Sequence, residues 1–212
     1  MVQNFVIPHS RPTLDESDLL SVSKVIRSGR IVQGEVVEKF ENKVAKYIGV
    51  DGAVAMNTGT SALHLSLLAI GIKEGDYVAM PSFVCTALLN AVRYVGAHPT
   101  LVDIDPETYN IDIRDLKKRV KKSTKAIILP HLFGLPADID EIVSLGIPVI
   151  EDCAQAIGAV YKGRKVGSFG KLSCFSFYAT KVLSTGEGGM VVSDSKSLLK
   201  KIRDFRDYDN KK

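Results

Sequence analysis

From residue 50 onward, the 212-residue chain alternates short apolar runs with helical hydrophobic patterns. The short runs predict buried strands at Ala53–Met56, Tyr77–Met80, Thr100–Val102, Ala126–Leu129 and Val149–Ile150. The intervening stretches predict helices over Ser61–Ile70, Thr86–Val95, Ile113–Lys121 and Ile139–Leu145. Apolar strands that alternate with helices are typical of a largely parallel sheet with helices on both faces. The pattern therefore predicts an α/β fold.

Two helical patterns precede this region. The first begins at Thr13-Leu14-Asp15-Glu16, whose spacing fits a capping box, and ends before Gly29. The second follows Gly34 and ends at Gly49, with apolar residues at helical spacing between them. We therefore expect an N-terminal arm with helices over residues 1–49 and one large domain over residues 50–212.

Glycine-rich turns replace helices as connections after residue 160. Val166–Gly167, Leu172–Phe177 and Gly188–Val192 predict two or three further strands. A closing helix is predicted over Lys196–Phe205, before a polar tail from Asp207 to Lys212.

Composition narrows the class of protein only moderately. The chain is 45% hydrophobic and 25% charged, and its formal charge of +4 is a mild excess. Its densest basic run, Arg114 to Lys125, fits the polar face and end of a helix, so we expect no nucleic-acid partner. Met1–Arg11 does not resemble a signal peptide, and no apolar run reaches about 18 residues, so we expect no membrane span.

The three cysteines show no metal-site or redox spacing. They are odd in number, lack a CxxC pair and each lie in an apolar stretch, which predicts buried, reduced thiols in a cytoplasmic protein. The three are Cys85, Cys153 and Cys174.

Candidate chemistry gathers where the predicted strands end, because ligands of open α/β sheets bind at the carboxyl edge. The segment Asn57-Thr58-Gly59-Thr60-Ser61 joins a strand to a helix start, where free amides favour an anion such as phosphate. Thr60 would also serve simply as a helix cap. Asp152 follows a buried strand and would suit a protonated ring nitrogen, a metal ion or a helix cap.

Lys181 follows another apolar strand, within Ser176-Phe177-Tyr178-Ala179-Thr180-Lys181. A lysine near a buried site can act as a Schiff-base nucleophile, although most lysines simply lie on the surface. An anion site, an acid and a lysine on three different strand ends, in that order, favour a cofactor site over three unrelated residues.

Several segments together resemble one family, in this order along the chain: Gly59-Thr60-Ser61-Ala62-Leu63-His64-Leu65, Val102-Asp103-Ile104-Asp105, Val149-Ile150-Glu151-Asp152 with Gln155, Gly167-Ser168-Phe169-Gly170, Phe175 to Lys181, and Gly186-Glu187-Gly188-Gly189. The chain thus resembles the DegT/DnrJ/EryC1/StrS family of sugar aminotransferases, which use pyridoxal 5′-phosphate, from about Ile7 to Phe205. The resemblance implies the large domain of a type I pyridoxal-phosphate-dependent transferase, a mostly parallel sheet sandwiched by helices.

The resemblance also implies a role for individual residues. Lys181 would hold pyridoxal 5′-phosphate covalently and, once displaced by substrate, move protons. Asp152 would pair with the ring nitrogen, and Gln155 would lie near the phenolic oxygen. Gly59, Thr60 and Ser176 would contact the phosphate. His64, His131 and Glu187 also match family positions, and we interpret the two histidines as structural and Glu187 as part of a turn.

Two departures from the family stand out. Cys85 lies where many relatives place an aromatic residue against the cofactor ring, a contact that sulfur tolerates. Relatives also continue into a smaller C-terminal domain that helps bind substrate, and these 212 residues do not include it.

The resemblance implies transfer of an amino group, with glutamate as the expected donor and a keto nucleotide-sugar as acceptor, in a homodimer. Two alternatives stay open. One is a sugar dehydratase of the same fold, in which relatives replace the lysine by histidine. The other is a non-catalytic binding or regulatory remnant.

Overall fold

A computed structural model describes residues 7–8 and 10–207, and the predicted polar tail after Asp207 lies outside them. Its main feature is a seven-stranded sheet in the order β1-β9-β8-β5-β4-β2-β3. The strands are β1 (Gly52–Met56), β2 (Tyr77–Pro81), β3 (His98–Val102), β4 (Thr124–Pro130), β5 (Val149–Asp152), β8 (Leu172–Ser176) and β9 (Gly189–Ser193), with the hairpin β6 (Val160–Tyr161) and β7 (Arg164–Lys165) apart from the sheet.

Strands β8, β5, β4, β2 and β3 run parallel, whereas β9 runs antiparallel to both of its neighbours. The helices are α1 (Glu16–Arg27), α2 (Glu35–Ile48), α3 (Gly59–Ala69), α4 (Thr86–Tyr94), α5 (Ile113–Arg119), the 3₁₀ turn η1 (Leu132–Gly134), α6 (Ile139–Val143) and α7 (Lys196–Arg206). The predicted α/β fold is confirmed, and the predicted strands and helices of residues 50–150 agree with the structure to within about two residues at each end.

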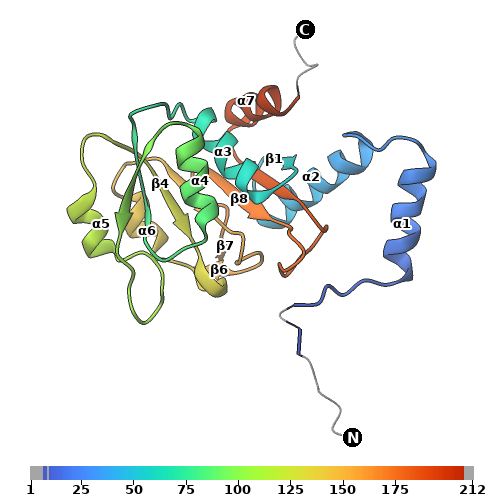
Figure 1. The fold of residues 1–212 in the computed structure, drawn as a ribbon, viewed down its shortest axis with the longest axis horizontal. Coiled ribbons are helices and arrows are strands. Elements are labelled where there is room, and N and C mark those ends of the chain that lie inside the picture. The colour runs from blue at the N-terminus through green and yellow to red at the C-terminus, as the bar shows by residue number, and fades with distance from the viewer. Residues whose placement is uncertain (1–6, 9, 208–212) are drawn as a thin grey trace, which may run out of the picture.

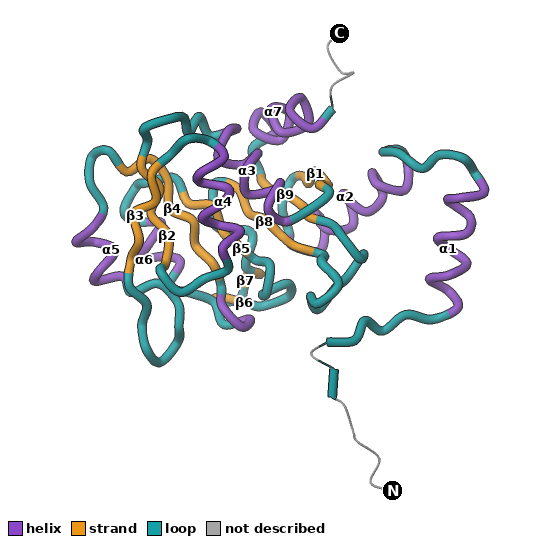
Figure 2. The backbone as a smooth tube through the Cα atoms, in the orientation of Figure 1, coloured by secondary structure: helices purple, strands orange, loops and turns teal. Residues whose placement is uncertain are grey.

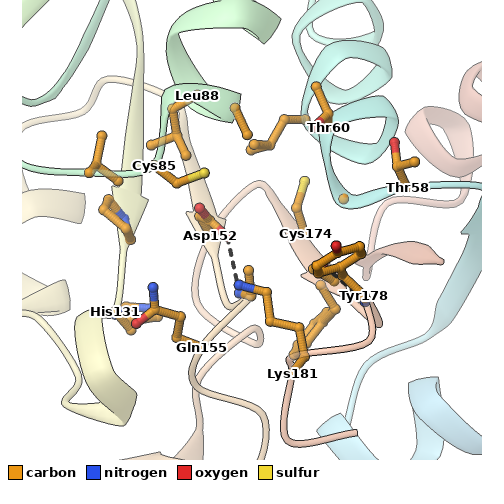
Figure 3. Close-up of a pocket in the computed structure, with 18 of the residues that line it drawn as sticks. Thr58, Thr60, Cys85, Leu88, His131, Asp152, Gln155, Cys174, Tyr178 and Lys181 are labelled. Atoms are coloured by element: carbon orange, nitrogen blue, oxygen red, sulfur yellow. Dashed lines mark hydrogen bonds between the residues drawn. The ribbon is translucent and has the colours of Figure 1, made fainter. Parts of the chain in front are cut away.

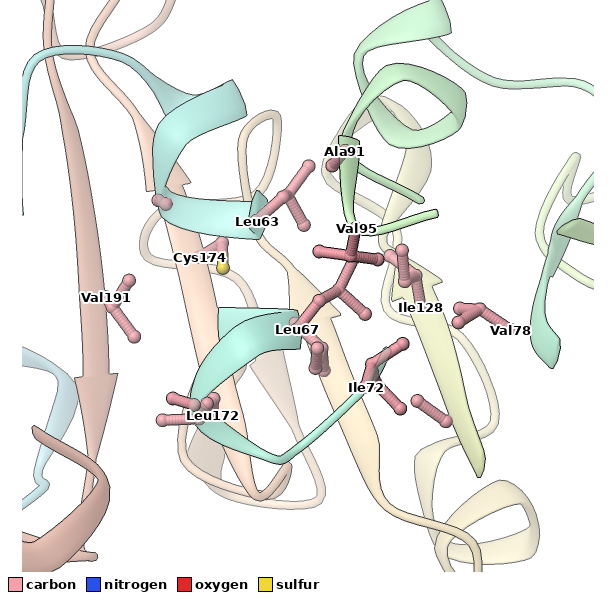
Figure 4. Packing of buried hydrophobic residues seen from close by; sticks show 14 of the residues in the cluster. Leu63, Leu67, Ile72, Val78, Ala91, Val95, Ile128, Leu172, Cys174 and Val191 are labelled. Carbon is pink, nitrogen blue, oxygen red and sulfur yellow. The ribbon is translucent and has the colours of Figure 1, made fainter. Parts of the chain in front are cut away.

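Helices cover both faces of the sheet, as an apolar parallel sheet requires (Figure 1). On one face α3, α4 and α7 enclose a core that includes Leu67, Leu88 and Ile202 (Figure 4 shows part of it). On the other face α2, α5 and α6 enclose a second core that includes Leu116 and Ile142. Because β3, β2, β4, β5 and β8 are parallel, their carboxyl ends lie at the same edge of this covered sheet.

The outer strand β1 is joined to the flanking helices by charged side chains. Glu41 of α2 accepts a hydrogen bond from the Ala55 N–H at 2.8 Å. It also forms an ion pair with Arg206 of α7 at 2.7 Å. Arg206 also donates to the Ala55 carbonyl at 3.1 Å, and Arg203 donates to the Ala53 carbonyl at 2.8 Å. Side chains therefore bond three backbone groups of the edge strand β1, which leaves fewer of them free to pair with another strand.

Two local predictions were wrong. Asp15, not Thr13, caps α1. In the reciprocal bond of the capping box, the Asp15 N–H donates to the side chain of Asp18, and Glu16 takes no part. Val166–Gly167 does not form a strand, because the β6–β7 hairpin precedes it and Gly167 instead belongs to a turn that binds a buried carboxylate.

Helix α1 stands away from the sheet and contributes no buried residue (Figure 2). Every helix in the described residues is too short or too polar to cross a bilayer.

Candidate active site

A pocket of about 330 Å³ opens at the carboxyl ends of β4, β5 and β8, beside the start of α3. This volume lies in the usual range for small-molecule sites. The residues that line it include all seven predicted site residues: Gly59, Thr60, Cys85, Asp152, Gln155, Ser176 and Lys181. Figure 3 shows Asp152, Lys181 and Thr60 approaching the same space from different elements.

The start of α3 forms the anion-binding end of the pocket. The Thr58 hydroxyl accepts the Ser61 N–H at 3.0 Å, so Thr58 is the helix cap and the interpretation of Thr60 as a cap was wrong. Thr60 lies instead in the first turn, where backbone amides fall outside the helical hydrogen-bond ladder. A Cβ atom at Gly59 would lie 2.9 Å from Ser176 Cβ, so glycine allows α3 and the end of β8 to approach closely. Amides and hydroxyls on two elements thus surround a space suited to phosphate.

Asp152 is the acidic group of the pocket. It ends β5, is buried, and accepts the Ala154 N–H through Oδ1 at 3.0 Å. Burial raises the pKa of Asp152, while the Ala154 bond and the positive charge of Lys181 act against that rise. A carboxylate in such a place gains from a cationic partner, and a protonated ring nitrogen would supply one.

Lys181 lies in the turn after β8, with its N–H donating to the Tyr178 carbonyl at 2.9 Å. Its side chain extends toward Asp152 across the pocket (Figure 3). The lysine and the acid therefore lie at the same small-molecule site although 29 positions separate them in the sequence (181 minus 152).

Gln155 and Cys85 complete the predicted set. Gln155 Oε1 accepts the Phe133 N–H at 3.0 Å, which fixes the amide plane and leaves its NH₂ group to donate elsewhere. The prediction that Cys85 is buried was wrong: it is exposed at the pocket, because it immediately precedes α4 in a loop at the sheet edge. Cys153 and Cys174 are buried, and burial raises the pKa of both thiols.

The two histidines that we interpreted as structural have different surroundings. His64 is half-buried in α3, and burial lowers its pKa; its ring meets the Tyr94 ring edge-on at 5.6 Å. His131 lines the pocket, yet both of its ring nitrogens bond to protein groups, to Glu151 at 3.0 Å and to the Ala137 N–H at 3.2 Å. Glu187 lines the pocket from a turn, in which its carbonyl accepts the Thr185 hydroxyl at 2.7 Å.

The sequence did not lead us to expect a role for Glu151 in this site. It is fully buried in β5, directly before Asp152, and interacts with His131. The available signal was its charge, because a glutamate inside an apolar strand is rare unless it is paired.

A family model described as the DegT/DnrJ/EryC1/StrS aminotransferase family matches residues 12–212. The chain belongs to this family. The predicted family and the predicted fold are both confirmed, and the family is one of aminotransferases.

Individual relatives agree with this assignment. The chain is 43% identical over 205 residues to GDP-perosamine synthase of Escherichia coli O157:H7, an alignment that covers 94% of this chain and 56% of the relative. The structure of an aminotransferase from Psychrobacter cryohalolentis matches with a TM-score of 0.88 and 36% identity, over 91% of this chain and 50% of that one. This chain thus spans about half the length of the relatives that it matches.

A third relative bears on the cofactor. The structure of E. coli GDP-4-keto-6-deoxy-D-mannose-3-dehydratase with bound hydrated PLP matches with a TM-score of 0.86 and 31% identity, over 90% of this chain and 52% of that one. The prediction of a pyridoxal-phosphate cofactor is therefore confirmed at the level of the family.

Proposed function

We propose that this chain forms the cofactor-binding half of an aminotransferase that moves an amino group from glutamate to a keto sugar carried by a nucleotide. The observation that carries the proposal is the single pocket that brings together Lys181, Asp152 and the start of α3. A lysine, an acid and an anion site match the three polar ends of pyridoxal 5′-phosphate: its aldehyde, its ring nitrogen and its phosphate.

The residues fit this cofactor by charge and by position. We assign the phosphate to Gly59, Thr60 and Ser176, because the first residues of α3 and Ser176 line the same pocket and Gly59 lies too close to Ser176 to carry a side chain. Asp152 would pair with the ring nitrogen and keep it protonated, which relieves the cost of its own buried charge. Bound pyridoxal phosphate would supply an electron-poor ring that stabilises negative charge on the carbon that loses a proton.

Three side chains would act around the ring. Gln155 would donate its NH₂ group to the phenolic oxygen, since its oxygen already accepts the Phe133 N–H. Cys85 would lie against one ring face at the mouth of the pocket. Lys181 Nζ would hold the aldehyde end covalently and, once released by the amino donor, carry a proton between the donor and the ring system.

The partners in this proposal come from the family relationship. The name GDP-perosamine synthase indicates a nucleotide-linked amino sugar for that relative, which supports a keto nucleotide-sugar as the acceptor here. Glutamate as the donor, assembly as a homodimer and a cytoplasmic location stay predictions.

A dehydratase of the same fold is the second candidate, because the chain also matches GDP-4-keto-6-deoxy-D-mannose-3-dehydratase. The family resemblance associates dehydration with histidine at the lysine position. Lys181 occupies that position here and faces the pocket, which favours transamination.

A half-reaction tests the proposal without the acceptor sugar. Chain loaded with pyridoxal phosphate is mixed with glutamate, and 2-oxoglutarate is measured by mass spectrometry. We expect close to one 2-oxoglutarate per loaded site in wild type and none above background in Lys181→Ala. Adding a keto nucleotide-sugar to the protein whose cofactor now carries the amino group should then give an amino sugar, whereas a dehydratase would release water from the sugar. A loaded, folded chain that converts no amino donor would refute the aminotransferase proposal.

A further inference from the structure

Glu151 and Asp152 are successive residues of β5, and their carboxylates lie on opposite faces of the sheet. Neighbouring side chains of a strand leave on opposite faces, so Asp152 faces the pocket while Glu151 faces the layer beneath it. Glu151 is completely buried there. A buried carboxylate without partners would be strongly destabilising, so its hydrogen bonds identify its role.

Five donors surround the Glu151 carboxylate. Oε1 accepts the N–H groups of Phe169 at 2.8 Å and Gly170 at 2.6 Å, and the Ser173 hydroxyl at 3.1 Å. Oε2 accepts the Gly167 N–H at 2.8 Å and lies 3.0 Å from His131 Nε2. Burial acts to raise the pKa of Glu151, but the bonds from His131 and the loop amides overcome it and lower the pKa. Glu151 is therefore an ionised acceptor whose oxygens are fully used.

The proton of His131 is located by its two neighbours. Nδ1 accepts the Ala137 N–H at 3.2 Å, so it carries no proton itself, and the proton lies on Nε2. Nε2 then donates to Glu151 Oε2. The main-chain N–H of His131 also donates to the Asp152 carbonyl at 3.2 Å. Glu151 is thus connected to Asp152 along the strand and again through His131.

His131, Glu151 and Cys153 place one nitrogen, one oxygen and one sulfur within 4.8 Å of one another, a grouping that a metal ion could use. The hydrogen bonds argue for another role. Both His131 nitrogens and both Glu151 oxygens already have protein partners, and burial raises the pKa of the Cys153 thiol. The cluster is a hydrogen-bonded support rather than a ligand set.

We propose that Glu151 is a positioning residue for the cofactor site. Its carboxylate keeps the His131 proton on Nε2 and ties His131 and the 167–170 turn to β5, so that Asp152 is held at a fixed place facing Lys181. This inference rests on the proposed function for its consequence, cofactor binding, but the arrangement of protons can be measured without any cofactor.

The first test is the His131 tautomer, read by nitrogen-15 NMR on protein labelled at its four histidines, with His131→Gln used to assign the signal. At pH 8 we expect the proton on Nε2 and none on Nδ1 in wild type. In Glu151→Gln the NH₂ group faces either Nε2, which then loses its acceptor, or the three donors of Phe169, Gly170 and Ser173, so we expect this signature to disappear. A wild-type ring with its proton on Nδ1, or with protons on both nitrogens, would overturn the inference even if Glu151→Gln fails to fold.

The second test measures the dissociation constant of pyridoxal phosphate in the same chain. We expect Glu151→Gln to weaken binding on the order of 10-fold or more, as substitutions that support a site's contacting residues commonly do. Ser173→Ala is the matched control, because it removes one donor and keeps the carboxylate with its four other donors; it should change binding no more than about 3-fold.

The possible outcomes separate the two proposals. A folded Glu151→Gln protein that binds as tightly as wild type would refute the positioning role and leave the proposed function standing. A wild-type chain that binds no cofactor would refute the proposed function, and the tautomer measurement would still decide whether Glu151 controls His131.

Discussion

Helices α1 and α3 are of similar length, but different forces determine them. Helix α1 has a capping box at Asp15, acidic residues in its first turn and basic residues in its last turn, yet it buries no side chain. Helix α3 carries no charge at either end, buries five of its residues, and packs against β8, β9 and α4. Local signals specify α1, whereas tertiary packing specifies α3. The candidate active site uses α3, because only a packed helix holds its first turn at a fixed place.

The sharpest way to separate the two helices is to remove one leucine from each. Leu67 of α3 is completely buried, and Leu67→Ala should lower the free energy of unfolding by about 2–5 kcal/mol. Leu19 of α1 is 59% exposed, and Leu19→Ala should change it by no more than about 0.5 kcal/mol. Urea unfolding of both variants measures the difference. Equal losses would mean that α1 is packed against something in solution.

The close contact between Gly189 and the residues at the start of α3 provides a second test. A Cβ atom at Gly189 of β9 would overlap the Thr58 carbonyl, a backbone atom that cannot rotate away. We expect Gly189→Ala to cost about 1–3 kcal/mol of stability through overpacking and to weaken binding of pyridoxal phosphate as well. Gly29→Ala, next to α1, is an open position and serves as the control for stability, although its positive φ adds some strain. Unchanged cofactor binding in Gly189→Ala would show that this contact does not shape the pocket.

The buried carboxyl group of Asp152 should lower the stability of the folded chain when no cofactor is bound. Because burial raises the pKa of Asp152, the folded chain binds this proton more tightly than the unfolded chain. Stability is therefore lost as the pH rises above the unfolded pKa of the group, and at pH 7 the penalty is present. Asp152→Asn keeps an oxygen for the Ala154 N–H and should stabilise the cofactor-free chain on the order of 1 kcal/mol, while weakening cofactor binding.

Thermal melts at pH 7 of wild type and Asp152→Asn, with and without pyridoxal phosphate, measure both effects. A variant that is less stable without cofactor and binds it equally well would contradict the assignment of Asp152 as the partner of the ring nitrogen.

The helix caps give the smallest expected difference. Asp15→Ala should lower the local stability of α1 by about 1 kcal/mol, which would be measured as faster amide hydrogen exchange in that helix. The free energy of global unfolding should change little, because α1 buries no residue. Thr58→Ala removes the bond to the Ser61 N–H and should lower the global stability by about 1 kcal/mol. A global loss from Asp15→Ala as large as that from Thr58→Ala would contradict the separation of the two helices.

The sequence predicted the parts of this molecule that depend on local pattern. Alternating apolar runs located the sheet and the helices of residues 50–150, and the strand ends located Gly59, Asp152 and Lys181. The pairing of those strands brings the three residues together, and this was expected only from the rule that ligands bind at the carboxyl edge and from the resemblance to a family.

Features that depend on three-dimensional neighbours were not predictable. Nothing near Cys85 in the sequence shows that its apolar segment turns outward at the sheet edge. The bonds of Glu151 reach residues 16 to 22 positions away, His131 in one direction and the 167–170 turn and Ser173 in the other, so its supporting role required the folded structure. The cap of α3 was misplaced for a related reason: Thr58 and Thr60 have the same chemistry, and only backbone geometry distinguishes them.

A direct chemical test exists for our proposal that Lys181 forms the covalent link to the cofactor in this pocket. The purified chain is mixed with pyridoxal phosphate, reduced with borohydride, digested and analysed by mass spectrometry, with Lys39→Ala as a control at an exposed lysine. We predict one pyridoxyl group, on the peptide that contains Lys181, that is lost in Lys181→Ala and kept in Lys39→Ala. A folded chain that gains no adduct, or gains it on scattered surface lysines instead, would contradict the account.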